Sequence, residues 1–195
     1  MAIADLGMVM KALGFTLIEL MVALAIVALL LLLGMPSFTT FLRNSEIRST
    51  AESLINGLRT ASAEATRQNE KVVFTLGPGA DWAINRATNA DCTGLVNPPI
   101  QQFAGKEVGK NSKITVTPAK TTVCFNGLGR IVNQGTAGDH IQQIEVQSFV
   151  ANEARSLRII VDDTAAADPT KPRGMRMCDP DAALKLLVPP DPRAC

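Results

Sequence analysis

The sequence predicts an α+β protein in which one long N-terminal helix packs on an antiparallel β-sheet. Two observations indicate this class. An almost unbroken apolar run over residues 15–35 continues into a segment with helical periodicity that ends near Gln68. After Asn69 the chain changes to short β-branched segments bounded by Gly, Pro, Asn or Asp, as strands are. The 195 residues are enough for one domain with a sizeable core beside the helix.

The apolar run from Phe15 to Met35 is long enough to span a membrane. A helix of this length rises about 30 Å, which matches the hydrocarbon core of a bilayer. The alternative is a secretory signal peptide, whose apolar region is shorter and leads to a cleavage site of small residues. Here the run continues into Pro36 and a polar helix, so residues 15–35 are predicted to form the transmembrane half of the helix.

Residues 36–69 are predicted to form the second, amphipathic half of the same helix. Pro36 can bend or restart the helix at the junction. Beyond it, apolar or small residues recur at spacings of three and four, which is typical of one helical face. These residues are Phe38, Phe41, Leu42, Ala51, Leu54, Ile55, Leu58, Ala61 and Ala65. This face is expected to pack under the sheet.

Residues 70–195 are predicted to form a β-sheet domain with a C-terminal tail. The strand-like segments are KVVFTLG, DWAIN, KITVTP, TVCFNGLGRIV, HIQQIEVQSFV, RSLRIIVDD and RGMRMC. Residues 86–111 are rich in Asn, Gly and Pro, so a long loop is expected there. The Asn126–Gly127 pair suits a tight turn with positive φ.

One acidic residue, Glu19, lies near the start of the apolar run. Inserting a charge into a membrane costs about 2.5 kcal/mol or more, so such a residue is a functional candidate. If the chain began at Phe15, its α-amino group would lie one helical turn from Glu19, or close to the Glu19 of a neighbouring copy. An acid and an amine can pair inside lipid, whereas an unpaired acid is unfavourable there.

The segment KALGFTLIELMVALAIVALLLLLGMP resembles the class III signal of type IV pilins and type II secretion pseudopilins. The resemblance implies that residues 1–14 are a leader, which a prepilin peptidase removes by cutting between Gly14 and Phe15. It also implies N-methylation of Phe15, a helix-bending Pro36, and a Glu19 that neutralises the amine of an adjacent subunit during assembly.

The same resemblance implies a location and partners. The chain would be a single-pass protein of the inner membrane, with its C-terminal domain in the periplasm, and would enter a pilus after assembly. Its implied partners are other pilins and minor pilins through the N-terminal helix, the prepilin peptidase and inner-membrane lipid.

Two C-terminal segments, CFNGLGRIV and RGMRMCDP, together with the DPRAC ending, resemble the GspH/FimT/FimU branch of minor pilins. This narrower resemblance implies a minor pilin of a type IV pilus, which primes or supports pilus assembly. Pseudopilins of type II secretion of the GspH type share the fold and remain an alternative.

A short basic cluster, formed by Lys171, Arg173 and Arg176, indicates a further alternative. FimT-type proteins carry a Gly-Arg-x-Arg motif that is thought to grip DNA for natural transformation. Aligned on Cys178, Arg176 matches the second Arg of that motif, but Arg173 precedes Gly174 where the motif has Gly-Arg. The basic cluster therefore has two interpretations. The protein is a pilus-associated receptor for double-stranded DNA, or the three residues are solvated charges at a sheet edge. The net charge of +1 provides no global basic field.

Four cysteines in a chain whose bulk should face the periplasm indicate disulfides, and they allow three pairings. The preferred pairing joins Cys178 to Cys195, because that bridge would tie down the C-terminal tail. Cys92 would then pair with Cys124 and hold the long loop to the sheet. A metal site is not expected, because Cys-x-x-Cys spacing is absent and His140 is the only histidine.

The sequence marks no active site and no cofactor site, so an enzyme is not expected. His140 stands alone at a predicted strand start, where a surface or turn position is expected for it. The Gly-rich segments GPGADW and GTAGDH lack the Walker pattern and its Lys, so hairpin turns are expected there.

Overall fold

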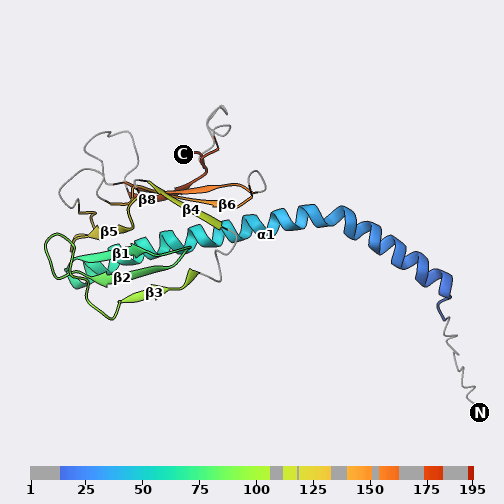
Figure 1. Ribbon diagram of the computed structural model, residues 1–195, viewed down its shortest axis with the longest axis horizontal. Helices are drawn as coiled ribbons and strands as arrows, with labels where there is room; N and C mark the ends of the chain where they lie inside the picture. Colours follow the sequence, from blue (N-terminus) through green and yellow to red (C-terminus); the bar gives the residue numbers. More distant parts are fainter. Residues whose placement is uncertain are drawn as a thin grey trace, which may run out of the picture. The chain divides into compact units, whose positions relative to one another are not determined.

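The fold is known from a computed structural model, which describes residues 14–105, 112–117, 119–132, 140–150, 154–162, 174–181 and 193–195. The chain divides into two compact units, Met1–Thr39 and Thr40–Cys195. One helix, α1, begins in the first unit and ends in the second. The described strands all belong to the second unit (Figure 1).

Helix α1 spans Leu17–Gln68 and ends in a Schellman motif. Asn69, directly after the helix, has a positive φ of 52°, which Asn tolerates better than most residues. The Asn69 N–H donates to the carbonyl of Thr66, and the Glu70 N–H donates to the carbonyl of Ala65, both at 3.3 Å. These bonds satisfy carbonyl groups that the last turn of a helix otherwise leaves open.

The described strands form two four-stranded sheets, with the orders β3-β2-β1-β5 and β4-β6-β7-β8. All six strand pairings are antiparallel. The strands are β1 Val72–Leu76, β2 Trp82–Arg86, β3 Gln101–Phe103, β4 Ser112–Thr117, β5 Thr122–Phe125, β6 Gln143–Ser148, β7 Leu157–Asp162 and β8 Gly174–Cys178. This arrangement confirms the predicted α+β class.

Both sheets bury one face against the C-terminal half of α1, so they share one hydrophobic core (Figure 1). The helix supplies Ile47, Ala51, Leu54, Ile55, Leu58, Ala61 and Ala65. The first sheet supplies Val72, Phe74, Ile84, Val123 and Phe125, and the second supplies Ile144, Val146, Ile159 and Val161. Each fully buried large aliphatic side chain contributes about 1.5–3 kcal/mol, so this shared core is the main source of stability in the second unit.

The sheet region differs from the sequence prediction in two respects. The strands form two sheets instead of one, and part of the expected loop 86–111 forms the edge strand β3. β3 has only three residues, and two of them are Gln, so it shows no alternation of apolar and polar residues. Its existence depends on pairing with β2, in which Trp82 lies opposite Phe103.

The apolar face of α1 is buried from Ile47 onward, but not before it. Phe38, Phe41 and Leu42, which were expected on this buried face, are 62%, 67% and 50% exposed. Periodicity identifies the apolar face of a helix, but it does not reveal where the covering sheets end.

The turn after β5 owes its positive φ to Gly129, at 72°, and not to the Asn126–Gly127 pair as expected. Asn126 Oδ1 accepts two backbone N–H groups of the turn, both at 3.0 Å. Gly127 serves a different purpose, because a Cβ atom there would lie 2.5 Å from Asn69 Oδ1 at the end of α1. The turn therefore needs glycine at one position for φ and at the other for close approach.

His140 is buried, so the expectation of a surface position was wrong, although the residue lies at a bend before β6. The next residue, Ile141, lies in the core, and its N–H donates to the carbonyl of Thr122 at 3.1 Å. This backbone pairing draws the segment before β6 against β5. The burial is a tertiary effect that the residue type did not indicate.

Gly57 allows α1 to approach an aromatic cluster. The ring of Trp82 lies 6.0 Å from that of Phe74 and 5.7 Å from that of Phe103. Trp82 Nε1–H donates to Ser53 Oγ on the helix at 3.1 Å. A Cβ atom on Gly57 would lie 2.9 Å from a Phe74 ring carbon and 3.0 Å from the Trp82 ring. The Phe74 and Trp82 side chains are buried, so they have little room to move away.

Replacing Gly57 with Val should lower the free energy of unfolding by about 2 kcal/mol, because overpacking a filled core forces side chains off their rotamers. Asn56→Val at the neighbouring exposed position is the control for helix propensity. Thermal unfolding followed by the fluorescence of Trp82, the single tryptophan, measures both variants. Equal stability of the two variants would contradict the close packing.

Candidate functional site

Thr16 and Glu19 begin α1 in the Thr-x-x-Glu arrangement of a capping box. The Glu19 N–H donates to Thr16 Oγ1 at 3.3 Å, and the Leu20 N–H donates to the Thr16 carbonyl at 3.2 Å. Thr16 is therefore the N-cap. Glu19 lies in the first turn, where a carboxylate interacts favourably with the helix dipole. The sequence analysis missed the role of Thr16, although the Thr-x-x-Glu spacing would have identified it.

The segment Leu17–Met35 of α1 is long and apolar enough to cross a membrane, and within the described residues it is the one helix of this kind. Its 19 residues have a mean hydropathy of 2.8, and none of the segment is buried inside the chain. An apolar surface of this size needs apolar surroundings, which lipid or neighbouring helices supply. Because Glu19 lies in the first turn, its carboxylate is at one end of the span and not at its centre.

The predicted processing site lies just before the helix. Gly14 and Phe15 precede α1 and are both exposed. A Cβ atom on Gly14 would meet no other atom within 4 Å. The peptide bond that joins them is therefore uncovered by the described part of the chain, as binding by a peptidase requires.

Pro36 lies inside α1, so the helix does not restart there. Proline has no N–H, and the carbonyl of Leu32 consequently lacks its usual helical donor at this point.

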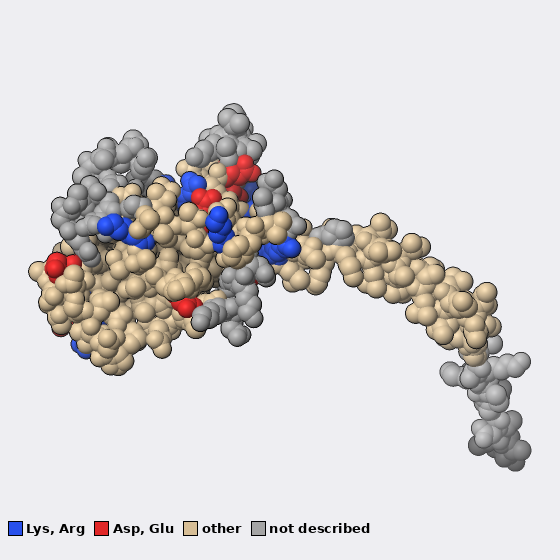
Figure 2. All heavy atoms as spheres, viewed as in Figure 1, with Lys and Arg blue, Asp and Glu red and all other residues tan. Residues whose placement is uncertain are grey.

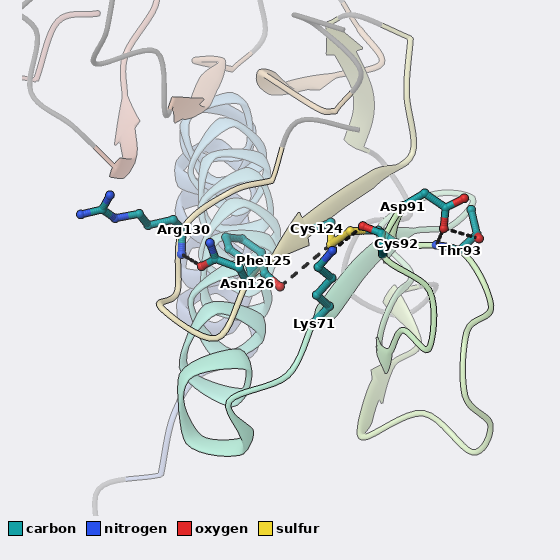
Figure 3. Close-up of a disulfide and its surroundings, with 9 residues drawn as sticks. Lys71, Asp91, Cys92, Thr93, Cys124, Phe125, Asn126 and Arg130 are labelled. Atoms are coloured by element: carbon teal, nitrogen blue, oxygen red, sulfur yellow. Dashed lines mark hydrogen bonds between the residues drawn. A yellow bond between two sulfur atoms is a disulfide. The ribbon is translucent and has the colours of Figure 1, made fainter. Parts of the chain in front are cut away.

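The Cys92–Cys124 disulfide joins the loop after β2 to strand β5 (Figure 3). The two Cα atoms are 6.2 Å apart, and both cysteines are buried together with Val73. Cys92 has a positive φ of 62°, and the Lys71 ammonium donates to the carbonyl of Ala90 in the same loop. The loop is therefore held to the first sheet by a covalent bond and by a charged hydrogen bond.

Asp91 orders this loop locally (Figure 3). Its Oδ1 accepts from the Thr93 hydroxyl at 2.6 Å and from the Thr93 N–H at 3.2 Å. The side-chain hydrogen bond from Thr93, and next its N–H, lower the pKa of Asp91 because they stabilise the ionised form. A lowered pKa stabilises the fold above the unfolded-state pKa, and this contribution is lost as the pH falls through the folded-state value.

The second disulfide joins Cys178, at the end of β8, to Cys195. Their Cα atoms are 5.2 Å apart. Asp179, next to the bridge, makes two backbone hydrogen bonds with the tail. Its N–H donates to the Arg193 carbonyl at 2.7 Å, and its carbonyl accepts from the Cys195 N–H at 2.9 Å. Residues 193–195 are therefore fastened to the second sheet.

Arg176 lies in β8 on the outer face of the second sheet. Met175 and Met177 on either side of it pack against the core, so Arg176 points the other way. On the same face, Arg158 of β7 pairs with Glu145 of β6 at 3.0 Å. Part of the positive charge of this face is thus neutralised within the sheet.

The other two residues of the predicted DNA contact, Lys171 and Arg173, lie outside the described residues. In Figure 2, the described Lys and Arg side chains on the visible face are interspersed with Asp and Glu and form no continuous basic area. The described residues also contain no group of three His, Cys, Asp or Glu side chains placed to bind a metal ion.

An apolar helix long enough to span a membrane that continues under antiparallel sheets, with an exposed segment before its capped N-terminus, is typical of a pilin-like protein. A family model described as type II transport protein GspH matches residues 50–165. A model of the prokaryotic N-terminal methylation motif matches residues 9–35. The first match covers more than half of the chain, which therefore belongs to the GspH family, as a type IV pilin-like protein of the GspH/FimT type. No curated protein and no solved structure matches the chain.

Removing either disulfide by a double Cys→Ser substitution should lower the free energy of unfolding by about 3–4 kcal/mol, by the chain-entropy account. The Cys92–Cys124 bridge should contribute more, because it closes 32 residues instead of 17 and is buried. Denaturant unfolding of the two double variants beside the parent chain tests this order. A larger loss for the Cys178/Cys195 variant would show that tail docking, and not loop closure, dominates.

Proposed function

We propose that this protein is a minor pilin of a type IV pilus, which primes or supports pilus assembly. The observation that carries the proposal is the joining of an N-terminal methylation motif to a GspH-type domain by one continuous helix. A structural role of this kind requires a removable leader, a membrane anchor and a folded domain that offers surfaces to partners. The described residues fit the second and third of these requirements.

In this proposal a prepilin peptidase cuts between Gly14 and Phe15, and the new N-terminal Phe15 is methylated. The chain is held in the inner membrane by Leu17–Met35 with its second unit in the periplasm, which is the oxidising compartment that two disulfides require. Glu19 then pairs with the α-amino group of an adjacent subunit. The pairing offsets the cost of holding each charge in an apolar helix bundle, and so favours one register between subunits.

Replacing Glu19 with Gln should leave processing intact but lower incorporation into pili at least about tenfold. The variant leaves the α-amino group of the adjacent subunit without its partner, and an unpaired charge inside lipid costs about 2.5 kcal/mol or more. Glu52→Gln, an exposed carboxylate of the second unit that pairs with Arg48, is the matched control. Sheared pili and membranes are compared by immunoblot, and intact mass reports removal of residues 1–14 and methylation of Phe15.

Two outcomes would contradict the proposal. Normal incorporation of the Glu19→Gln variant would exclude the charge-pairing role of Glu19. Retention of residues 1–14 in a host with an active prepilin peptidase would exclude the pilin pathway altogether.

A type II secretion pseudopilin is the second candidate, favoured by the description of the matching family as a type II transport protein. The two candidates share processing and anchoring, so only the phenotype separates them. Deleting the gene should abolish or reduce surface pili if the protein is a minor pilin. Loss of exoprotein secretion with normal piliation would instead identify the pseudopilin.

A further inference from the structure

We propose that the end of the second unit at which α1 enters it docks on the surface of a phospholipid bilayer. The inference rests on the membrane anchor proposed above and adds an interaction surface to it. The surface, named here the lipid-facing patch, consists of Phe41, Leu42, Phe149 and Val150.

The four side chains of the lipid-facing patch are exposed, whereas the core side chains of the second unit are buried. Phe149 and Val150 are 66% and 46% exposed, and Phe41 and Leu42 on the helix are exposed to a similar degree. Single exposed apolar side chains are common on soluble surfaces, whereas several large ones at the same end of a unit mark an interaction site.

A hydrogen bond brings the two halves of the patch to the same end of the unit. Asn44 Oδ1 accepts from the N–H of Arg155 at 3.0 Å. Asn44 follows Leu42 by two residues on α1, and Arg155 belongs to the connection between β6 and β7. Phe149 and Val150 lie in that same connection, directly after β6. Arg155 is therefore fastened to the helix beside the point where α1 enters the unit.

An apolar groove extends the patch. The groove has a volume of about 530 Å³, and Phe149, Leu76, Ile114 and Val116 are among its lining residues. Ser112 also lines it, and the Ser112 hydroxyl is buried without a hydrogen-bond partner among the residues that the structure describes.

Two exposed bases flank the patch. Lys113 lies in β4, where it pairs in register with Gln147 of β6 two residues before Phe149. The Arg155 side chain is 66% exposed, and the Asp179 carboxylate lies 4.0 Å from it. Because Arg155 pairs with Asp179, Lys113 is the base that places an exposed positive charge beside the apolar side chains, and this arrangement suits the headgroup region of an anionic bilayer.

The length of the connection favours lipid over other occupants. The span ends at Met35 and the second unit begins at Thr40, so five backbone steps reach at most about 18 Å. Whatever the orientation of the two units, Phe41 and Leu42 stay close to the membrane surface. A second copy of the chain must diffuse to the patch, whereas the bilayer is present at a high effective concentration.

The test uses the full chain in liposomes of phosphatidylethanolamine and phosphatidylglycerol at a low ratio of protein to lipid. All four native cysteines are in disulfides, so an added cysteine can carry an environment-sensitive fluorophore. A label at Val150→Cys should be quenched by headgroup-level nitroxide lipids about twice as strongly as a label at Leu128→Cys. Adding Phe149→Asp should remove that difference.

Leu128 is the matched control because it is an exposed apolar residue in the turn that contacts the far part of α1. The neighbouring Gly129 carbonyl accepts from Ser62 Oγ at 2.9 Å. Ser62 follows Leu42 by 20 residues, which corresponds to about 30 Å along the helix and exceeds the thickness of the headgroup region.

A third label, at Ala28→Cys in the span, distinguishes failure of the anchor from failure of the docking. Quenching of this label by nitroxides deep in the acyl chains, without preferential quenching at Val150→Cys, would overturn the docking alone. Absence of quenching at both positions would overturn the anchor and the docking together. The Val150→Cys label could instead become more buried as the protein concentration rises, without quenching by lipid nitroxides. That result would assign the patch to a second copy of the chain and would overturn the proposal.

Discussion

The structure depends on one physical constraint, which is that a single helix meets two different surroundings. From Leu17 to Met35 its apolar side chains have no cover from the chain itself. From Ile47 to Ala65 one apolar face is fully covered by both sheets. The first segment exposes an apolar surface that an apolar medium would stabilise, and the second carries the core that gives the second unit its stability. The change of surroundings takes place within about three helical turns.

Several contacts at the C-terminal end of α1 align the first sheet on the helix. The Schellman motif at Asn69 turns the chain from the helix into β1, and Gly127 lets the turn after β5 approach that motif closely. The Gly129 carbonyl accepts from Ser62 on the helix, so the same turn is fixed from two sides. The Cys92–Cys124 bridge adds a covalent link between β5 and the loop after β2. The first sheet is thus held to the helix by local geometry as well as by burial.

The distribution of charge differs between the apolar segment of α1 and the second sheet. The apolar segment contains one carboxylate, Glu19, at its capped end, where the helix dipole favours it. On the second sheet, the Arg158–Glu145 pair neutralises part of the outer face beside Arg176. Charges that pair within the chain contribute little to a long-range field.

By itself, the sequence determined the class of the protein. The apolar run, the helical spacing from Ala51 to Ala65 and the β-branched segments after Asn69 each reflect short-range patterns of one or two dozen residues. The family match confirmed the pilin-like resemblance, which rests on the segments KALGFTLIELMVALAIVALLLLLGMP, CFNGLGRIV and RGMRMCDP. The tertiary structure alone decided the division into two sheets, the strand β3, the burial of His140 and the choice among three cysteine pairings. These features depend on contacts between residues far apart in the chain, and such contacts leave no local periodicity in the sequence.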